Sequence, residues 1–114
     1  MSNLVGVVEL RNRRCVFSYG DAFRIESRNW RGSLHVTEIP SIIVDAIGRS
    51  FAGMTVTVEQ VAPLAGRLAA EHGLPYWYGH KRRFFAQDGL LVLVALDRAT
   101  HEKAGRGWRY TVKG

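Results

Sequence analysis

The chain has 114 residues, a length typical of one domain that buries its own hydrophobic core. Hydrophobic residues at 46% and charged residues at 23% exclude a chain that is disordered throughout. The formal net charge of +6 favours an acidic partner, nucleic acid before an anionic membrane or an acidic protein.

Cysteine content and hydropathy limit the compartment and the kind of site. The single cysteine, Cys15, excludes an intrachain disulfide and any zinc site built from several cysteines, and it fits a reducing compartment. The N-terminus lacks the basic and apolar segments of a signal peptide. The longest apolar run is much shorter than the roughly 20 residues that a membrane span needs. We therefore expect a cytoplasmic protein with no membrane partner.

Residues 4–37 are predicted to form a β meander. Segments 4–10 and 15–18 are rich in apolar and β-branched residues, and a polar break separates them. Segment 22–28 alternates apolar and polar side chains, which is the period of a half-buried strand, and a fourth short segment follows after a turn. We expect three or four strands, whose pairing order stays open, in a subdomain that spans residues 1–38.

The pattern becomes helical after Pro40. Apolar positions recur there at three-four spacing, which predicts a helix that begins at Ser41 or at the proline turn and ends at Gly53. A very short strand is then predicted over residues 54–57.

A second helix is predicted after this strand. Thr57 is a suitable N-cap, and Gln60 completes a capping-box pattern with it. The helix is expected to end near Gly73. Because Pro63 removes one backbone hydrogen bond, we expect either a bend at this residue or a later start of the helix.

The stretch 81–96 admits two structures. As one helix it places its apolar residues at three-four spacing, at a cost of about 1 kcal/mol for Gly89 relative to alanine. Asp88-Gly89 is also typical of a tight turn, which would make residues 83–87 and 90–96 two buried strands of a hairpin. We favour the helix because the sequence that follows fits it.

A two-stranded hairpin is predicted at the C-terminus. Residues 99–103 lead to a glycine-rich cationic turn at 104–107. Residues 108–112 then alternate, with Trp108 and Tyr110 on the same face.

This order of elements resembles the winged helix-turn-helix superfamily of DNA-binding domains over residues 39–113. The run from Leu93 to Val112 carries the likeness, since it has a helix that ends on leucine, a tight turn, a strand, a Gly/Arg wing tip and a returning strand. The resemblance implies an α+β fold. In it, the N-terminal β meander (1–38) is appended to a three-helix winged helix-turn-helix domain (39–114) with a C-terminal β-hairpin wing.

The resemblance also implies where the chain binds nucleic acid. The third helix would enter the major groove with its first residues at base edges, and the wing would lie along the backbone or minor groove. Arginine and glutamine suit this role because they form paired hydrogen bonds with guanine and adenine. The implied nucleic-acid-binding residues are Tyr78, His80, Lys81, Arg82, Arg83, Gln87, Lys103, Arg106 and Arg109. The expected core consists of Ile42, Ile43, Ile47, Phe51, Leu64, Leu68, Phe84, Leu91, Val92, Leu96 and Val112.

The sequence gives no comparable pattern for catalysis or for a cofactor. The four histidines lack the spacing of metal ligands, and the ten acidic residues are scattered. The glycines form neither a dinucleotide-binding fingerprint nor a phosphate-binding loop. We therefore expect no enzyme activity, no cofactor and no metal site.

The leading hypothesis is a non-enzymatic protein that binds double-stranded DNA, as a transcriptional regulator or a chromosome-associated factor. Two alternatives stay open: an RNA-binding α+β domain, and a winged-helix module that binds another protein without touching nucleic acid. The apolar strand over residues 4–10 is an expected surface for a homodimer.

Overall fold

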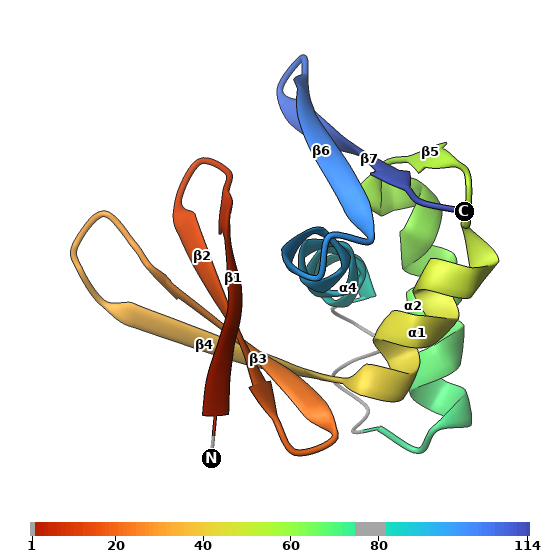
Figure 1. Cartoon of the computed structure of the whole chain (residues 1–114), viewed down its shortest axis with the longest axis horizontal. Helices are drawn as coiled ribbons and strands as arrows, with labels where there is room; N and C mark the ends of the chain where they lie inside the picture. The colour runs from red at the N-terminus through yellow and green to blue at the C-terminus, as the bar shows by residue number, and fades with distance from the viewer. Residues whose placement is uncertain (1, 75–81) are drawn as a thin grey trace.

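The structure of the chain is a computed structural model that describes residues 2–74 and 82–114 (Figure 1). The fold is α+β, with a four-stranded antiparallel sheet, three helices in the described residues and a C-terminal hairpin. The elements in chain order are β1 (Ser2–Glu9), β2 (Arg13–Tyr19), β3 (Ala22–Arg28), β4 (Leu34–Pro40), α1 (Ser41–Ser50), β5 (Thr55–Val56), α2 (Val58–Glu71), α4 (Arg82–Ala95), β6 (Ala99–Ala104) and β7 (Gly107–Val112).

The N-terminal sheet is a meander in which each strand pairs with the next, in the order β1-β2-β3-β4. Of the three or four strands expected, all four form, and the prediction of a meander is confirmed. The turn from β2 to β3 contains Gly20 at a φ of +60°, a conformation that glycine adopts without strain. The turn from β3 to β4 is held by Asn29, whose side-chain oxygen accepts hydrogen bonds from the backbone N–H groups of Arg31 and Ser33.

The C-terminal hairpin belongs to a second, three-stranded sheet with the order β5-β7-β6. The two residues of β5 pair with β7, Thr55 opposite Thr111 and Val56 opposite Tyr110. The predicted short strand and the predicted hairpin are both confirmed. Their pairing connects the hairpin to the segment between α1 and α2, which fixes its direction.

Helix α4 lies between the N-terminal sheet on one side and α1 and α2 on the other (Figure 1). It forms over Arg82–Ala95, so the prediction of a helix is confirmed and the alternative hairpin at Asp88-Gly89 is wrong. The central side chains from Leu90 to Leu93 are completely buried. Burial on two sides compensates for the glycine in the middle of the helix.

Two glycines allow the close contacts around α4. A Cβ atom at Gly89 would lie 2.6 Å from the Cδ1 atom of Ile47 on α1. A Cβ atom at Gly6 on β1 would lie 3.0 Å from the backbone oxygen of Ala95 at the end of α4. The glycine that resembles a turn signal in the sequence therefore serves helix packing.

The predicted core needs two corrections. Ile42 and Phe84 are exposed by 54% and 61%, whereas Phe85 is buried in place of Phe84. Ile42 lies beside the buried stripe of α1, which consists of Ile43, Val44, Ile47 and Gly48. Phe85 is buried because α4 is covered on two sides, so its buried arc is wider than a single three-four stripe, and this arc begins after Phe84. The predicted residues that are buried are Ile43, Ile47, Leu68, Leu91, Val92 and Val112, and those that are partly buried are Phe51, Leu64 and Leu96.

Helix α2 begins at Val58 in spite of its proline. The capping box is present, because the backbone N–H of Thr57 donates to the Gln60 side chain at 2.8 Å and the Thr57 hydroxyl accepts from the Gln60 N–H at 3.4 Å. Of the two expected alternatives, a bend at Pro63 or a later start, the later start is wrong, since the cap fixes the first turn at Val58 and Pro63 is exposed within the helix. The helix ends before Gly73, as predicted, with that glycine at a φ of +64°.

The two predicted regions share one hydrophobic core. The expected boundary after residue 38 lies within β4 (Leu34–Pro40). The core contains Val16 and Ile25 of the meander together with the buried residues of α4. Within the described residues, no helix is both long and apolar enough to cross a membrane.

The Gly89→Ala substitution should destabilise the protein by about 1–2 kcal/mol, because the overlap with Ile47 exceeds the gain of about 1 kcal/mol in helix propensity. Adding Ile47→Val, which removes the overlapping Cδ1 atom, should recover part of that loss. Gly66→Ala in α2 is the matched control, because its Cβ would meet the Arg82 side chain at an ordinary 3.4 Å. It should stabilise by about 1 kcal/mol. Urea unfolding measures the free energy of unfolding of all three variants. Equal changes in Gly89→Ala and Gly66→Ala would contradict the packing role of Gly89.

Candidate nucleic-acid interface

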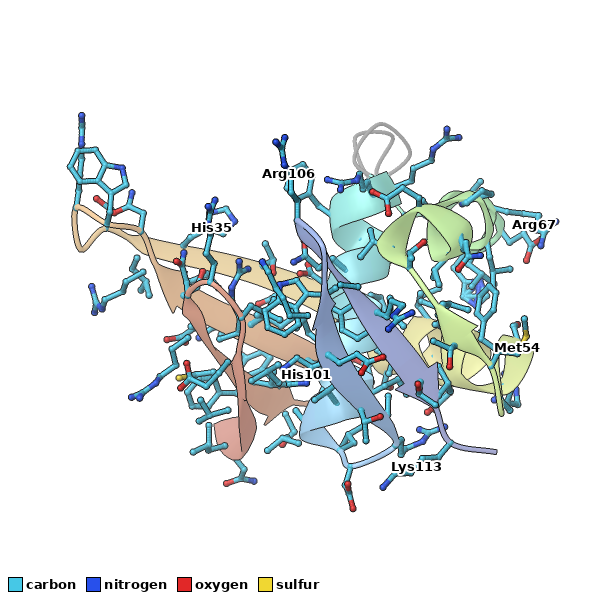
Figure 2. The ribbon with its side chains drawn as sticks, turned by 90° about the horizontal axis from the view of Figure 1, so that it is seen from above. His35, Met54, Arg67, His101, Arg106 and Lys113 are labelled. Carbon is cyan, nitrogen blue, oxygen red and sulfur yellow. The ribbon has the colours of Figure 1, made fainter. Side chains whose placement is uncertain are left out.

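Four tips of the fold lie at one end of the molecule, and we call this end the tip surface. It comprises the β1–β2 turn (residues 10–12), the β3–β4 turn (residues 29–33), the first turn of α4 and the β6–β7 turn (residues 105–106). Turns alternate between the two ends of an antiparallel meander, so the first two share an end. Figure 2 shows Arg106 at the end of the hairpin, on the side where α4 begins, with Lys113 on the opposite side.

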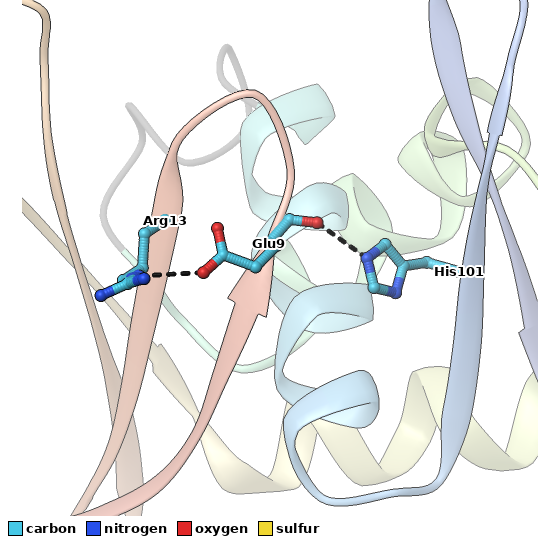
Figure 3. Close-up of polar contacts among 3 residues, drawn as sticks. All are labelled: Glu9, Arg13 and His101. Carbon is cyan, nitrogen blue, oxygen red and sulfur yellow. Dashed lines mark hydrogen bonds and ion pairs between the residues drawn. The ribbon is translucent and has the colours of Figure 1, made fainter.

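A hydrogen bond connects the hairpin to the N-terminal sheet near this surface. The Nε2 atom of His101 on β6 donates to the backbone oxygen of Glu9 on β1 at 2.9 Å (Figure 3). The ring of His101 also lies against Trp108 on β7, with 5.1 Å between ring centroids. These contacts hold the hairpin at a fixed position relative to β1.

The tip surface carries cations that no carboxylate neutralises. Seven basic residues at or next to the four tips form no ion pair with any carboxylate of the described chain. Ionised groups that lack a counter-ion add their full charge to the local potential. The seven residues are Arg11, Arg14, Arg28, Arg31, Arg82, Lys103 and Arg106, of which Arg14 lies close enough to Asp88 for its charge to act on that carboxyl.

Acidic residues near the tip surface are paired with other arginines. The Arg13 side chain donates to Glu9 at 2.9 Å, and Arg109 donates to Glu102 at 2.9 Å. The seven free cations are therefore not offset by these carboxylates.

The same pairing neutralises one predicted contact residue of α4. The Nε atom of Arg83 donates to the carboxylate of Glu59 on α2 at 2.8 Å. This hydrogen bond is the main reason that the pKa of the Glu59 carboxyl lies below its usual range. Arg83 and Arg109, both predicted to bind nucleic acid, thus each have a carboxylate partner.

The other predicted contact residues lie in different surroundings. Arg82 is exposed and packs its aliphatic stem against Gly66 of α2, whereas Gln87 is half-buried. Lys103 lies over the ring of Trp108, with its Nζ atom 5.4 Å from the centroid, and Arg106 is exposed in the β6–β7 turn. Tyr78, His80 and Lys81 lie outside the described residues.

Only the first turn of α4 reaches the surface in full. Arg82, Arg83 and Phe84 are exposed, and every later residue of the helix is buried or half-buried. The N-terminal sheet covers one side of the helix, and α1 and α2 cover the other (Figure 1). The part of α4 available to a partner is therefore its first turn.

A groove opens beside that first turn, between α4 and the inner face of the sheet. Its volume is about 710 Å³. One wall is the end of the sheet near the β1–β2 and β3–β4 turns, and the other is the first half of α4. The sequence does not predict this groove, because it forms between segments that are distant in the chain. Its one signal in the sequence is Asp88, an acidic residue within an apolar run. Its polar lining includes Asn12, Arg14, Ser27, His35, Thr37, Gln87 and Asp88.

The Asp88 carboxyl has an unusual environment in this groove. Burial raises its pKa from 3.8 to about 7, against the opposing effects of a hydrogen bond from Thr37 and the positive charge of Arg14. The Nε atom of Arg14 is buried and has no hydrogen-bond partner within residues 2–74 and 82–114. The hydroxyl of Tyr110 is also buried without a hydrogen-bond partner among these residues, and burial raises its pKa to about 12.

No protein-family model, curated protein or solved structure matches the chain. Among the residues that the structure describes, no group of three or more His, Cys, Asp or Glu side chains could hold a metal ion.

Asp88 should make the stability of the protein depend on pH. Its pKa is raised on folding, so between about pH 4 and pH 7 the folded chain keeps a proton that the unfolded chain has lost. Wild-type stability should therefore fall as pH rises through this window and level off above it. In Asp88→Asn this decline should disappear. The free energy of unfolding of the variant minus that of the wild type should therefore increase by roughly 2–3 kcal/mol between pH 5 and pH 8. Urea unfolding at several pH values measures the gap, and a constant gap would mean that Asp88 ionises at its ordinary pKa.

Proposed function

We propose that the chain is a non-enzymatic protein of winged-helix type that binds double-stranded DNA through its tip surface. The observation that carries the proposal is the set of seven unneutralised cations gathered at one end of the fold. Elsewhere, Arg98 forms an ion pair with Asp45, and Lys113 forms one with Asp97, both at 2.9 Å. Of the nine described lysine and arginine residues that form no ion pair, seven lie on the tip surface, and two, Arg49 of α1 and Arg67 of α2, lie elsewhere. Unpaired positive charge is thus concentrated on one surface, as binding to a polyanion requires.

The β6–β7 hairpin acts as the wing in this proposal. Its pairing with β5 and the hydrogen bond from His101 to β1 hold Arg106 and Lys103 at fixed positions. Cations fixed on a rigid backbone lose little freedom when they bind phosphates. The wing therefore contributes affinity through phosphate contacts, together with the turns of the N-terminal sheet.

Helix α4 contributes its first turn rather than its length. With Arg83 paired to Glu59 and Gln87 half-buried, Arg82 is the residue of the described helix that is free to reach a base edge. Phosphate contacts position a protein on DNA, and base contacts give it sequence preference. Few base contacts favour a chromosome-associated factor with weak sequence preference over a site-specific regulator.

The RNA-binding alternative has its own supporting observation, an exposed tryptophan. Trp30 in the β3–β4 turn is 86% exposed, and the guanidinium of Arg31 lies 4.6 Å from its ring centroid. Such a pair suits stacking on an unpaired base. Competition between duplex DNA, single strands and structured RNA separates the alternatives, and a protein-binding module would bind none of them. The predicted cytoplasmic location stays a prediction.

The double variant Arg82→Ala/Arg106→Ala should weaken duplex binding and flatten its salt dependence. Each lost phosphate contact should reduce the slope of log K against log salt by about one unit. Fluorescence anisotropy with a labelled duplex, repeated over a salt series, measures the slope. Lys113→Ala is the matched control, since it removes a charge at the opposite end (Figure 2) and should leave the slope unchanged. A similar loss of slope in both variants would reduce the interaction to net charge alone.

A homodimer through the N-terminal strands also remains a proposal. Figure 1 shows all the helices on one side of the N-terminal sheet, which leaves its outer face uncovered. On that face Leu4 and Val7 of β1 are exposed by 59% and 47%. A two-fold interface would bring copies of these side chains together.

Leu4→Lys/Val7→Lys should therefore dissociate such a dimer, because like charges would face each other across a two-fold interface. Multi-angle light scattering should give the mass of a dimer for the wild type and of a monomer for the variant. Circular dichroism checks that the variant keeps its fold. A wild-type mass equal to one chain at micromolar concentration would refute the dimer.

A further inference from the structure

The groove between α4 and the N-terminal sheet opens on the tip surface. Residues of both sheet turns, Asn12 and Asn29, line it together with Phe84 and Gln87 of α4. A ligand held by the cations of the tip surface therefore lies at the mouth of the groove. The volume of about 710 Å³ is in the range of sites that hold small organic ligands.

The lining of the groove combines a flat apolar surface with hydrogen-bonding groups. Phe84 is 61% exposed and begins one wall. Beside it, the Gln87 amide and the Asp88 carboxyl provide a donor and acceptors on the same helix. A nucleobase has the matching chemistry, with apolar faces for stacking and polar edges for hydrogen bonds.

The sheet side of the groove offers a donor that lacks a partner. The buried Nε atom of Arg14 makes no hydrogen bond within the described chain. Leaving a buried donor unpaired is unfavourable, and an acceptor on a ligand would satisfy it. Base carbonyl oxygens and ring nitrogens are acceptors of this kind.

We infer that the groove binds one unpaired base of a nucleic-acid strand whose phosphates lie on the tip surface. Bases within an intact duplex have their faces stacked and their pairing edges occupied, so only an unpaired base can enter. This inference rests on the proposed function and specifies its substrate, a duplex with a single-stranded end or loop. An extended peptide is the competing occupant.

The test compares three labelled DNA probes by fluorescence anisotropy: a blunt duplex, the same duplex with a short unpaired tail, and the same tail without bases. The tail with bases should strengthen binding about fivefold or more over the blunt duplex, as expected when one base stacks on an aromatic ring. The abasic tail carries the same phosphates and should give little gain. Equal gains from both tails would assign the effect to charge and overturn the inference.

The decisive variant is Phe84→Ala. It should abolish the gain from the tail, so that the variant binds the tailed and the blunt duplex with equal affinity. Ile42→Ala is the matched control, because Ile42 is a similarly exposed apolar residue on α1 and lies outside the groove. It should keep the full gain. If the gain survives in Phe84→Ala, the groove does not hold the base.

A measurement on the free protein separates failure of this inference from failure of the proposed function. In two-dimensional NMR, adenosine or cytidine monophosphate should shift the backbone amides of Thr37, Gln87 and Asp88. If no DNA probe binds but these amides shift, duplex binding fails and the base site stands. If DNA binds and the amides do not shift, the base site fails alone. Saturating shifts with an uncharged tripeptide, and none with the mononucleotides, would assign the groove to a peptide instead.

Discussion

The structure depends on the burial of α4 between two layers. The helix is completely buried from Leu90 to Leu93. Its contact with α1 is close at Gly89, where a Cβ atom would lie 2.6 Å from the Cδ1 atom of Ile47. The same helix supports the N-terminal sheet on its other side, where Gly6 approaches the backbone of Ala95. Interiors packed at this density tolerate little displacement, so the position of α4 sets the positions of both sheets.

This arrangement determines what the molecule can offer a partner. A helix covered on two sides presents only its first turn, which brings Arg82 and Phe84 to the surface and leaves Gln87 in the groove. The proposed contact surface is therefore assembled from the ends of several elements rather than from one helix face. The cations at these ends come from segments far apart in the chain, and the hydrogen bond between His101 and Glu9 keeps two of those segments together.

Local signals in the sequence predicted most elements, and long-range contacts explain what they missed. The capping box at Thr57 and the alternation in β3 depend on neighbouring residues, so they could be recognised without a structure. The burial of Phe85 in place of Phe84 could not, because it depends on which sides of α4 the sheet and the other helices cover. The pairing of Arg83 with Glu59 joins residues from two different helices. The sequence therefore overestimates the number of unpaired cations, because ion pairs between distant segments cannot be recognised in it.

The ion pair of Lys113 with Asp97 offsets one positive charge at the end opposite the wing (Figure 2), whereas the tip surface carries seven unpaired cations. A molecule whose unpaired positive charge is gathered at one pole has an electric dipole moment that points toward that pole. Near a polyanion, such a dipole experiences a torque that turns its positive pole toward the partner before contact. Encounters would then begin in nearly the right orientation, which raises the fraction of collisions that lead to binding.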